Sequence, residues 1–581
     1  MAWIRKSEID YKNIVYIKPN LRYKPKVLNK YFAIDTETYV DGSCILIAIS
    51  DGTTFDASML PHIFFTRKYR GATFFVYNLR FDAGVLLSWL PKENLIELKD
   101  TGYTEYNGFE VEYIPHKYLK IRRGKNNVKF WDLLQFYGMS LDEASRKYLG
   151  DAKIKMDTKM FTKEYVDKHF EDIKKYCVKD AELTKRLADV LIEYLQKFGL
   201  DLNRFYSTAY VGVEYLKYKK VAQDIYRIYS HVPGVIQAAL RAYKGGKFEM
   251  VRRGRGYFYQ YDINSAYPFE IAKLYNLEYA KVSTCTKYRD DADFGYIHCV
   301  VSIEDDIFHP VSVFDNTLTY YPVGRFKAWI TKQEFDYLVS KGANVDIIQA
   351  WWVRFEKKEY IYKDVVDELY KIKQKYKLTD RMLSHLAKIM LNGVYGKMIQ
   401  LIPDLFDMYK AGVLFNPLYA SVITANVRIR ISEIQQKYRD DIVAVHTDSV
   451  IATKPILDKE CGSEIGKWSK VNEGDGVMIL CGIYQVGDKI ATRCYSIDGG
   501  MSWIEYLQKA GKSTMVEIEE RRAVSWVEAV HYGKHNPCEF VVNKKVLNLN
   551  MDRKRIWLKQ TNAHKLSEGI ETSIPRFTYM V

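Results

Sequence analysis

The sequence predicts a multidomain protein of mixed α/β class, in which helices and sheets combine in an α+β arrangement. Its 581 residues exceed what one ordinary hydrophobic core holds, which indicates two or three domains. Strand-like runs at 30–40, 71–79 and 126–134 alternate with helical segments such as 181–197, where apolar residues recur at helical spacing. After residue 199 the chain changes to helical segments rich in tyrosine and lysine, so we expect a domain boundary near residue 200.

The composition indicates a globular protein without a membrane anchor. Hydrophobic residues make up 48% of the chain, and no run approaches the roughly 20 apolar residues of a membrane span. The first residues, MAWIRKSEIDYKN, lack the apolar core of a signal peptide. Eight cysteines occur without a CxxC pair, so neither a disulfide framework nor a zinc site is indicated. A reducing cytoplasm is the expected compartment.

The net charge is +15, and basic residues gather at 67–70, 116–125 and 252–256. Such clusters suit a phosphate backbone, and the 47 tyrosines could stack on unpaired bases. An AT-rich genome would also enrich lysine and tyrosine without any functional cause. Composition alone therefore leaves nucleic-acid binding open.

Three segments of the first 200 residues each present acidic side chains in a defined pattern. On a predicted strand Asp35 and Glu37 share one face, because side chains alternate along a strand. Asn78 and Asp82 lie where a strand passes into a helix. Further along, Tyr176 and Asp180 are one helical turn apart. Each pair alone is typical of a solvated face, but the ordered set predicts a site for two Mg²⁺ ions.

This ordered set resembles the three exonuclease motifs of the DEDD 3′–5′ proofreading domain of family B DNA polymerases. The resemblance implies an RNase H-like exonuclease domain at residues 1–200. It implies that Tyr176 orients the attacking water and that Lys155, in "AKIKMD", touches the scissile phosphate. The implied metal-binding acids are Asp35, Glu37, Asp82 and Asp180. The implied contacts to a single-stranded 3′ end are Thr38, Asn78 and Phe81.

The segment "YFYQYDINSAYPFEI" (257–271) is a predicted strand that ends in Asp262 and turns into Tyr267-Pro268. It resembles polymerase motif A, DxxSLYP, with Ala266 in place of leucine. The resemblance implies that Asp262 binds both metal ions, assisted by the Ile263 carbonyl. Tyr267 would lie under the incoming sugar and exclude a 2′-hydroxyl, the group that distinguishes RNA from DNA.

The segment "HLAKIMLNGVYGKM" (385–398) is predicted to be helical, with Lys388, Asn392 and Tyr395 on one face. It resembles motif B, KxxxNSxYG, with Gly393 in the serine position. The resemblance implies that Lys388 pairs with the triphosphate and that Asn392 and Tyr395 line the nucleotide pocket. One of the lysines at 373, 375 and 377 is expected to add a phosphate contact.

The segment "DIVAVHTDSVIAT" (441–453) forms two short predicted strands around "HTDS" and resembles motif C, DTDS. Asp448 takes the place of the metal-binding carboxylate, and His446 that of the other aspartate. Because positions i and i+2 share a face, the imidazole is expected to point toward the metals. Two hypotheses follow: His446 titrates near 6.5 and makes metal binding pH-sensitive, or it hydrogen-bonds the primer or a neighbouring backbone group.

Two further features narrow the resemblance to protein-primed family B polymerases of the phage phi-29 type. "RAYKGGKF" resembles the YxGG motif, as Tyr243, Gly245 and Gly246, where glycines permit close approach to the template. The 130 residues between Asp262 and Asn392 contain a β-rich block that resembles the first terminal-protein-region insertion.

The resemblance implies a right-hand polymerase domain at 201–581. Its expected parts are a palm at about 201–273 and 419–510, the insertion at 274–355, fingers at 356–397, a shortened second insertion at 398–418 and a thumb at 511–581.

Two departures from the family bear on function. Only 24 residues separate Tyr395 from Tyr419, so the second insertion is short and strong strand displacement is not expected. The KxY motif that steadies the primer end lacks a clear match. We assign Tyr484 to its tyrosine and Arg493 to a nearby phosphate contact.

The sequence therefore predicts a DNA-directed DNA polymerase with 3′–5′ proofreading, two Mg²⁺ (or Mn²⁺) ions per site, and DNA template, primer and dNTPs as partners. A monomer in the host cytoplasm, replicating a viral or linear plasmid genome from a terminal priming protein, is expected. The alternatives are a family B enzyme that uses ordinary primers or none, a DEDD exonuclease whose C-terminal part only grips DNA, and a non-catalytic basic scaffold.

Overall fold

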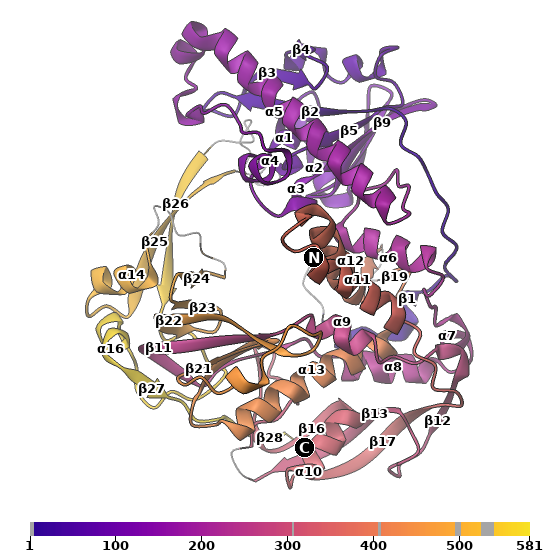
Figure 1. Ribbon diagram of the computed structural model, residues 1–581, viewed down its shortest axis with the longest axis vertical. Helices are drawn as coiled ribbons and strands as arrows, with labels where there is room; N and C mark the ends of the chain where they lie inside the picture. Colours follow the sequence, from indigo (N-terminus) through magenta and orange to yellow (C-terminus); the bar gives the residue numbers. More distant parts are fainter. Residues whose placement is uncertain are drawn as a thin grey trace.

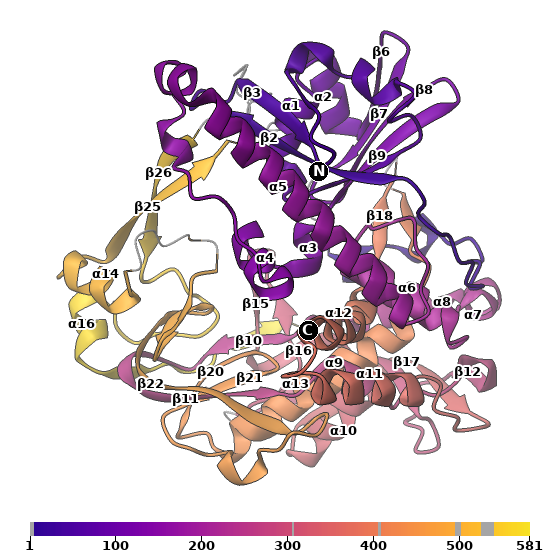
Figure 2. The ribbon, with the colours of Figure 1, turned by 45° about the horizontal axis from the view of Figure 1, so that its top comes forward.

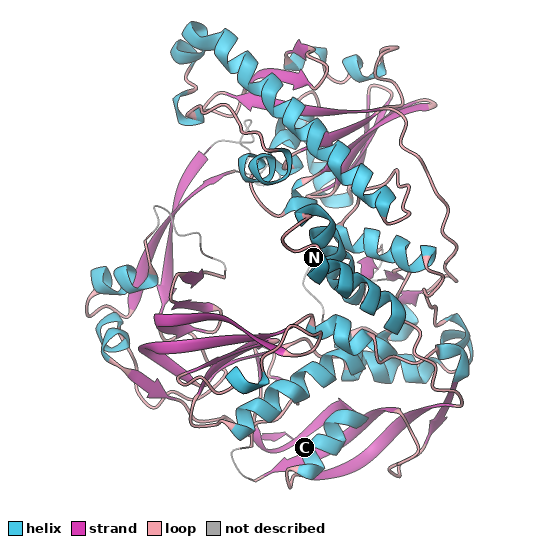
Figure 3. Cartoon of the chain, in the orientation of Figure 1, coloured by secondary structure: helices cyan, strands magenta, loops and turns pink. Residues whose placement is uncertain are grey.

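The computed structural model describes residues 5–304, 307–404, 408–493, 495, 501–524 and 540–580. Figures 1 and 3 show a sheet with helices at the top, a second sheet at the lower left, a third at the bottom and helices between them. Within the described residues, no helix combines the length and apolar character that crossing a bilayer requires.

The first sheet carries the strands of the N-terminal part, in the spatial order β4-β3-β2-β5-β9-β8-β7-β6. Its strands are β2 (Tyr31–Thr38), β3 (Cys44–Ile49), β4 (Thr54–Phe55), β5 (Thr73–Val76), β6 (Tyr103–Tyr106), β7 (Phe109–Ile114), β8 (Tyr118–Arg123) and β9 (Asn126–Asp132). Its helices are α1 (Leu79–Leu86), α2 (Lys92–Thr101), α3 (Leu134–Tyr137), α4 (Leu141–Leu149) and α5 (Lys163–Lys197). α5 bends at His169 and packs Ile173, Cys177 and Ala181 against β3.

The second sheet runs in the order β10-β20-β21-β11-β22-β23-β24, with β27 also paired to β11. Its strands are β10 (Lys247–Met250), β11 (Arg252–Ile263), β20 (Ile442–Thr447), β21 (Ser449–Ala452), β22 (Trp468–Leu480), β23 (Ile483–Val486), β24 (Lys489–Ala491) and β27 (Ile570–Thr572). The helices α8 (Pro233–Ala242), α9 (Ala266–Ile271) and α13 (Pro417–Lys437) pack together in contact with this region.

The β-rich block folds as a third sheet, in the order β12-β17-β13-β16-β28. It consists of β12 (Ala280–Thr284), β13 (Phe294–Ile303), β16 (Val323–Thr331), β17 (Asn344–Phe355) and β28 (Phe577–Met580), with α10 (Lys332–Ser340) against it. In the chain between β13 and β16, the short strands β14 (Val313–Phe314) and β15 (Thr319–Tyr320) pair as a small hairpin.

Between the sheets, α11 (Lys363–Lys375) and α12 (Arg381–Lys397) form a helix pair, and α6 (Thr208–Tyr218) packs along α12. The contact between α6 and α12 is close because both helices present glycine. A β-carbon on Gly393 would lie 2.6 Å from the Cα of Ala209, and one on Gly212 would lie 2.9 Å from the carbonyl oxygen of Met390. This explains why glycine stands at position 393, where the motif has serine.

The two ends of the chain pack against parts of the fold that are far from them in sequence. Residues 5–29, which we call the N-terminal arm, precede the first sheet but pack against α6 and α8. There β1 (Ile14–Val15) pairs with β19 (Tyr409–Ala411), which itself pairs with β18 (Leu401–Pro403). The backbone N–H of Tyr11 donates to Oε1 of Gln237, on α8, at 2.7 Å.

The segment 511–581, expected as one thumb, is divided among several parts of the fold. The hairpin of β25 (Met515–Ala523) and β26 (Phe540–Asn548) rises beside α14 (Trp503–Ala510) and α16 (Ala563–Glu568), as Figure 2 shows. The chain then returns, because β27 pairs with β11 and β28 adds a parallel strand to β16. Strand edges in the second and third sheets accept these last residues.

We expect Gly393→Ala to lower the melting temperature, because the added methyl group overpacks the contact with α6. Overpacking typically destabilises by about 1–3 kcal/mol. Gly396→Ala is the matched control on the same helix, since its β-carbon would meet nothing within 4 Å. Alanine there should leave the melting temperature unchanged or raise it, as helix propensity favours alanine by roughly 0.5–1 kcal/mol. Equal melting temperatures for the two variants would contradict the close contact.

Candidate active sites

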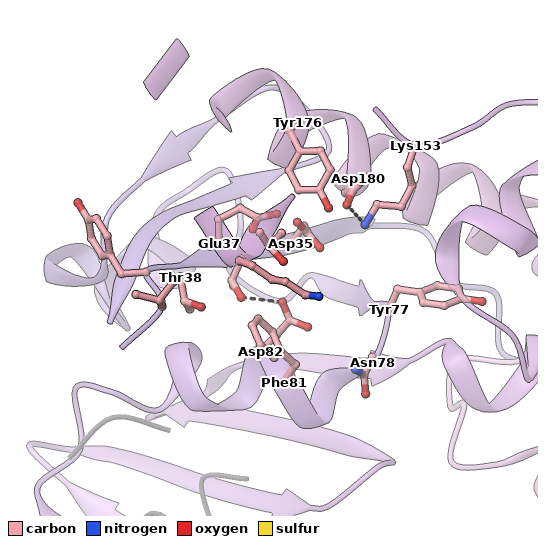
Figure 4. A pocket seen from close by; sticks show the side chains of 15 residues that line it. Asp35, Glu37, Thr38, Tyr77, Asn78, Phe81, Asp82, Lys153, Tyr176 and Asp180 are labelled. Atoms are coloured by element: carbon pink, nitrogen blue, oxygen red, sulfur yellow. Dashed lines mark hydrogen bonds and ion pairs between the residues drawn. The ribbon is translucent and has the colours of Figure 1, made fainter. Parts of the chain in front are cut away.

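Four carboxylates from three elements converge on a cavity of about 330 Å³ in the N-terminal part (Figure 4). Asp35 and Glu37 come from β2, Asp82 from the first turns of α1, and Asp180 from α5. Oγ1 of Thr36 donates to Asp82 at 2.8 Å, which fixes that carboxylate. Asp82 and Asp180 are buried, and Oδ1 of Asp180 has no hydrogen-bond partner among the described residues.

Burial and mutual repulsion disfavour ionisation of the carboxyl groups in this cavity. Burial, together with the charges of Asp180, Glu37 and Asp82, raises the pKa of Asp35 far above its usual value. Burial raises the pKa of Glu37 to about 8 and that of Asp82 to about 7, with neighbouring acids adding to both. Bringing these carboxylates together in a buried cavity is energetically unfavourable. Their oxygens are the ligands that a hard divalent cation prefers, and such a cation would neutralise their charge.

The lysine beside these acids is Lys153, which corrects the prediction of Lys155. Nζ of Lys153 pairs with Oδ2 of Asp180, and its side chain lines the cavity (Figure 4). Burial alone would lower the pKa of Lys153, but the interactions with Asp180 and Tyr176 together outweigh burial and raise that pKa. Lys155 is exposed and does not line the cavity, because two further residues of extended chain carry it past the acids.

The remaining predicted residues of the first site line the same cavity: Thr38, Asn78, Phe81 and Tyr176. Burial and the nearby charge of Glu37 raise the pKa of Tyr176, which therefore keeps its proton. The sequence reasoning missed Cys177, whose Sγ lies within 4.8 Å of carboxylate oxygens of Asp35 and Glu37 and donates to the Asp35 carbonyl at 3.6 Å. Its position directly after Tyr176 was the available signal.

A second acidic site lies where β11 meets the hairpin β20–β21. The register sets Asp262 opposite Ser449, and the N–H of Ile263 donates to the carbonyl of Asp448 at 3.0 Å. Oδ1 of Asp262 is buried without a hydrogen-bond partner among the described residues. Burial, with the charge of Asp262 adding to it, raises the pKa of Asp448 to about 6. The two carboxylates predicted to share metal ions are therefore close enough to repel each other.

Three tyrosines from separate segments meet beside this second site. The rings of Tyr267 and Tyr395 stack with centroids 4.6 Å apart and planes 13° apart. The hydroxyl groups of Tyr243 and Tyr395 are hydrogen-bonded at 2.7 Å. The motifs YxGG, A and B therefore contribute one aromatic cluster.

Cations accompany the tyrosines on the helix pair. Lys388 and Asn392 are exposed on α12. Of the three upstream lysines, Lys373 is the one held beside motif A, since its Nζ donates to Oγ of Ser265 at 3.0 Å. Burial lowers the pKa of Lys373, and the charge of Lys388 lowers it further. Lys373 thus contacts the turn that follows Asp262, and Lys388 lies near Lys373.

Of the two predicted glycines, Gly246 is the one that packing demands. A β-carbon on Gly246 would lie 2.7 Å from Cγ2 of Thr447, whereas one on Gly245 would meet nothing within 4 Å. The sequence reasoning missed Arg428 of α13, which is fully buried, pairs with Glu334 at 2.7 Å and donates to the carbonyls of Lys244 and Gly245. It joins the YxGG segment to the third sheet.

His446 does not point toward the metals, which corrects the prediction from strand alternation. Thr447 has a φ of 65°, so the strand ends there and Asp448 lies in the turn. The imidazole lies between the rings of Phe248 and Tyr484, with centroid distances of 4.6 and 4.9 Å. Burial, with Lys554, Lys489 and Arg493 nearby, lowers its pKa to about 3, so it does not titrate near 6.5. Neither ring nitrogen has a hydrogen-bond partner among the described residues, so the expected backbone bond is not formed.

Tyr484 and Arg493 both lie near this histidine, Tyr484 stacked on its ring and Arg493 beside Phe248. The hydroxyl of Tyr484 accepts from Nε2 of Gln260 at 3.3 Å, and burial together with the charge of Asp262 raises the pKa of Tyr484. Nη1 of Arg493 donates to the carbonyl of Cys481 at 3.0 Å. The sequence reasoning missed Lys554, in the last 65 residues, whose Nζ donates to the carbonyl of Phe248 at 2.7 Å.

Comparison with known proteins supports the motifs and the fold. Residues 152–401 match the family described as DNA polymerase type B, organellar and viral. A DNA polymerase of Acidianus bottle-shaped virus is 26% identical over 456 residues, covering 70% of this chain and 67% of that protein. A probable DNA polymerase of Ascobolus immersus is 25% identical over 374 residues, although the match spans only 30% of its length.

The chain is therefore similar to family B DNA polymerases of the organellar and viral type over residues 152–401. Its fold is similar to that of phi29 DNA polymerase in complex with primer-template DNA and incoming nucleotide, with a TM-score of 0.62 and 15% sequence identity, over 90% of this chain and 100% of that chain. A second structure of that polymerase, with single-stranded DNA, gives a TM-score of 0.57 over 89% of this chain. The predicted combination of an exonuclease-type domain with palm, fingers and thumb is therefore confirmed at the level of the fold.

Both acidic sites of this polymerase fit divalent metal ions. Each contains a buried carboxylate oxygen without a hydrogen-bond partner among the described residues, Oδ1 of Asp180 and Oδ1 of Asp262. The donors are oxygens, which Mg²⁺ and Mn²⁺ both accept.

We expect Glu37→Gln to raise the melting temperature of the metal-free polymerase, with a gain that grows from pH 5 to pH 8. The folded-state pKa of Glu37, about 8, lies above its usual 4.5, so the wild type loses stability as the pH rises through this interval. Differential scanning fluorimetry in EDTA measures the effect, which should be a few degrees (about 2–4 °C per kcal/mol in a domain of this size). Mg²⁺ should stabilise the wild type more than the variant.

Glu164→Gln, at an exposed position of α5, is the control and should behave as the wild type. If the Glu37→Gln gain did not depend on pH, the assigned repulsion among the acids would be wrong.

Proposed function

We propose that this polymerase extends a DNA 3′-end on a template by phosphoryl transfer at Asp262 and Asp448. The observation that carries this proposal is the convergence of motifs A, B, C and YxGG on one place. The unpartnered Asp262 oxygen, the raised pKa of Asp448 and the stack of Tyr267 on Tyr395 all lie there. A protein that only gripped DNA would have no use for that set, and a scaffold would leave its buried charge unexplained.

In the proposed reaction, Asp262 and Asp448 hold two Mg²⁺ or Mn²⁺ ions, with the Ile263 carbonyl as a further oxygen donor. Bound metal would neutralise charge on the α-phosphate and lower the pKa of the primer 3′-hydroxyl. Lys388 and Lys373 bind the triphosphate, and Asn392 and Tyr395 line the nucleotide pocket. Tyr267, held by its stack on Tyr395, blocks the space of a 2′-hydroxyl.

On the other side of Asp262, Tyr484 and Arg493 steady the primer end. Tyr243 and the glycines Gly245 and Gly246 let the template backbone approach. Catalysis then rests on positioning and charge rather than on a covalent intermediate.

We propose a second activity, 3′–5′ hydrolysis of single strands, at the cavity of Asp35, Glu37, Asp82 and Asp180. Tyr176 keeps its proton and so can orient a water molecule. Asn78, Phe81 and Thr38 line the wall where a strand end would lie, and Lys153 supplies the positive charge expected of Lys155. Together the two activities make a proofreading enzyme.

Asp262→Asn or Asp448→Asn should reduce Mg²⁺-dependent primer extension by roughly 10³-fold while leaving digestion of single strands intact. The loss follows from several kcal/mol of charge stabilisation, at about tenfold per 1.4 kcal/mol. Asp35→Asn combined with Glu37→Gln should do the reverse. Gel assays of one labelled primer, alone and annealed, measure both activities. Retained extension by the Asp448 variant would refute its role.

We further propose that initiation uses a terminal protein, in the replication of a viral or linear plasmid genome in the host cytoplasm by a monomeric enzyme. The support is the inserted third sheet and the similarity of the fold to phi29 DNA polymerase. The short β18–β19 hairpin favours ordinary primers, or none, as the alternative.

Incubation with labelled dNTP and neighbouring gene products should attach nucleotide covalently to one of these proteins. The Asp262→Asn variant is the control, and it should form no adduct. Extension of DNA primers without any protein adduct would favour the alternative.

A further inference from the structure

The N-terminal arm presents a row of cations to solvent. From residue 18 to residue 26 the chain is extended, so its side chains alternate between the protein and the solvent. Leu21 and Tyr23 face inward and pack against the core. The side chains at the even positions are exposed: Lys18, Asn20, Arg22, Lys24 and Lys26. From Arg22 to Lys26 successive cations are therefore about 6–7 Å apart along the arm.

The arm is held firmly in this position. The hydroxyl of Tyr23 accepts from the N–H of Asp201 at 2.7 Å, and the N–H of Lys26 donates to the Asp201 carbonyl at 3.0 Å. The ring of Tyr23 meets that of Tyr218, on α6, edge to face at 5.5 Å. In Figure 1 the arm is the indigo trace that runs down the right-hand edge, between the top sheet and the helices α6 and α7 (Tyr226–His231). The backbone that carries the row of cations is therefore already held in place, and it loses little conformational freedom when a ligand binds.

The arm and α6 enclose a cavity of about 360 Å³ that is rich in positive charge. Its cations are Arg22, Lys24, Lys26, Arg204 and Lys217, against the acids Asp201 and Glu214. Lys217 is paired with Glu214 at 2.9 Å. Among the described residues, the other four cations make no ion pair with a carboxylate. Positive charge is therefore available to a ligand.

The charged surface continues onto the first sheet. Burial lowers the pKa of Lys129, on β9, and the charges of Arg204, Lys120 and Lys26 lower it further, so these cations lie close together. Half-exposed aromatic rings accompany them. Tyr206 packs edge-on against Trp131 at 4.8 Å and against Tyr210 at 5.6 Å, and Tyr210 lines the cavity. Cations in a row with tyrosines beside them are the elements from which single-strand grooves are built.

We propose that this surface, formed by the N-terminal arm, Arg204, Lys129 and the rings of Tyr206 and Tyr210, binds the phosphodiester backbone of single-stranded DNA outside both active sites. The cations contact successive phosphates and the tyrosines offer faces for bases. That the bound strand is the template ahead of the helix pair α11–α12 rests on the proposed polymerase function.

The test uses the triple variant Lys24→Gln, Lys26→Gln and Arg204→Gln in the full chain. Fluorescence anisotropy with labelled dT20 in EDTA should show roughly tenfold weaker binding. The slope of log affinity against log salt should be smaller by up to about 2, since each phosphate contact in a single strand contributes about 0.7. Unchanged affinity and slope would overturn the proposal, and so would an equal loss of affinity for a blunt duplex.

Primer extension separates this proposal from the proposed function. On a template with a 2-nucleotide overhang the triple variant should extend as the wild type does, which requires only the active site. The wild type should bind the primer-template more tightly when the overhang is lengthened to 15 nucleotides. In the triple variant this gain in affinity should disappear. If the gain persisted, the surface would not hold the template.

Two further variants exclude trivial explanations. Lys281→Gln, Arg325→Gln and Lys341→Gln remove the same charge from exposed positions of the third sheet and the end of α10, and they should not change dT20 binding. Lys24→Arg, Lys26→Arg and Arg204→Lys keep the charge and should restore binding to the wild-type level. Loss of binding in both of these variants would overturn the assignment to this surface.

Discussion

Carboxylates held together against their own repulsion are the constraint on which this structure depends. In the first cavity four acids come from β2, α1 and α5, and burial raises the pKa of each, that of Glu37 to about 8 and that of Asp82 to about 7. At the second site the register of β11 against β21 sets Asp262 beside Asp448. Both arrangements lower the stability of the metal-free chain, and the packing of the surrounding core must offset this loss.

At the proposed polymerase site, close contacts between segments supply this stability. Gly246 allows the YxGG segment to touch Thr447, next to Asp448, and Gly393 allows α12 to touch α6. Arg428, buried and paired with Glu334, ties the YxGG carbonyls to the inserted sheet. The proposed metal site, the proposed nucleotide-binding helix α12 and the inserted third sheet are therefore parts of one packed unit, since a displacement of one would open contacts of the others.

The ends of the chain reinforce this unit. The N-terminal arm adds β1 to the short hairpin β18–β19, and the C-terminal residues add β27 to the second sheet and β28 to the third. Such strand additions join segments that are far apart in sequence. They also place Lys554 beside Phe248 and His446, near the polymerase site.

The sequence by itself determined the local chemistry of this protein. Asp35 and Glu37 share a strand face, Tyr176 and Asp180 share a helix face, and motifs A, B and C occur in order, because such patterns depend only on the geometry of one element. From them the family and the fold were predicted.

The tertiary structure alone decided which neighbours those residues have. It placed Lys153 rather than Lys155 beside the acids, and it revealed Cys177 and Arg428. It also packed His446 between two aromatic rings, while the positive φ of Thr447 carries Asp448 into the turn. It also carried the ends of the chain to distant sheets. These outcomes depend on contacts between segments far apart in sequence, and spacing along one element holds no information about them.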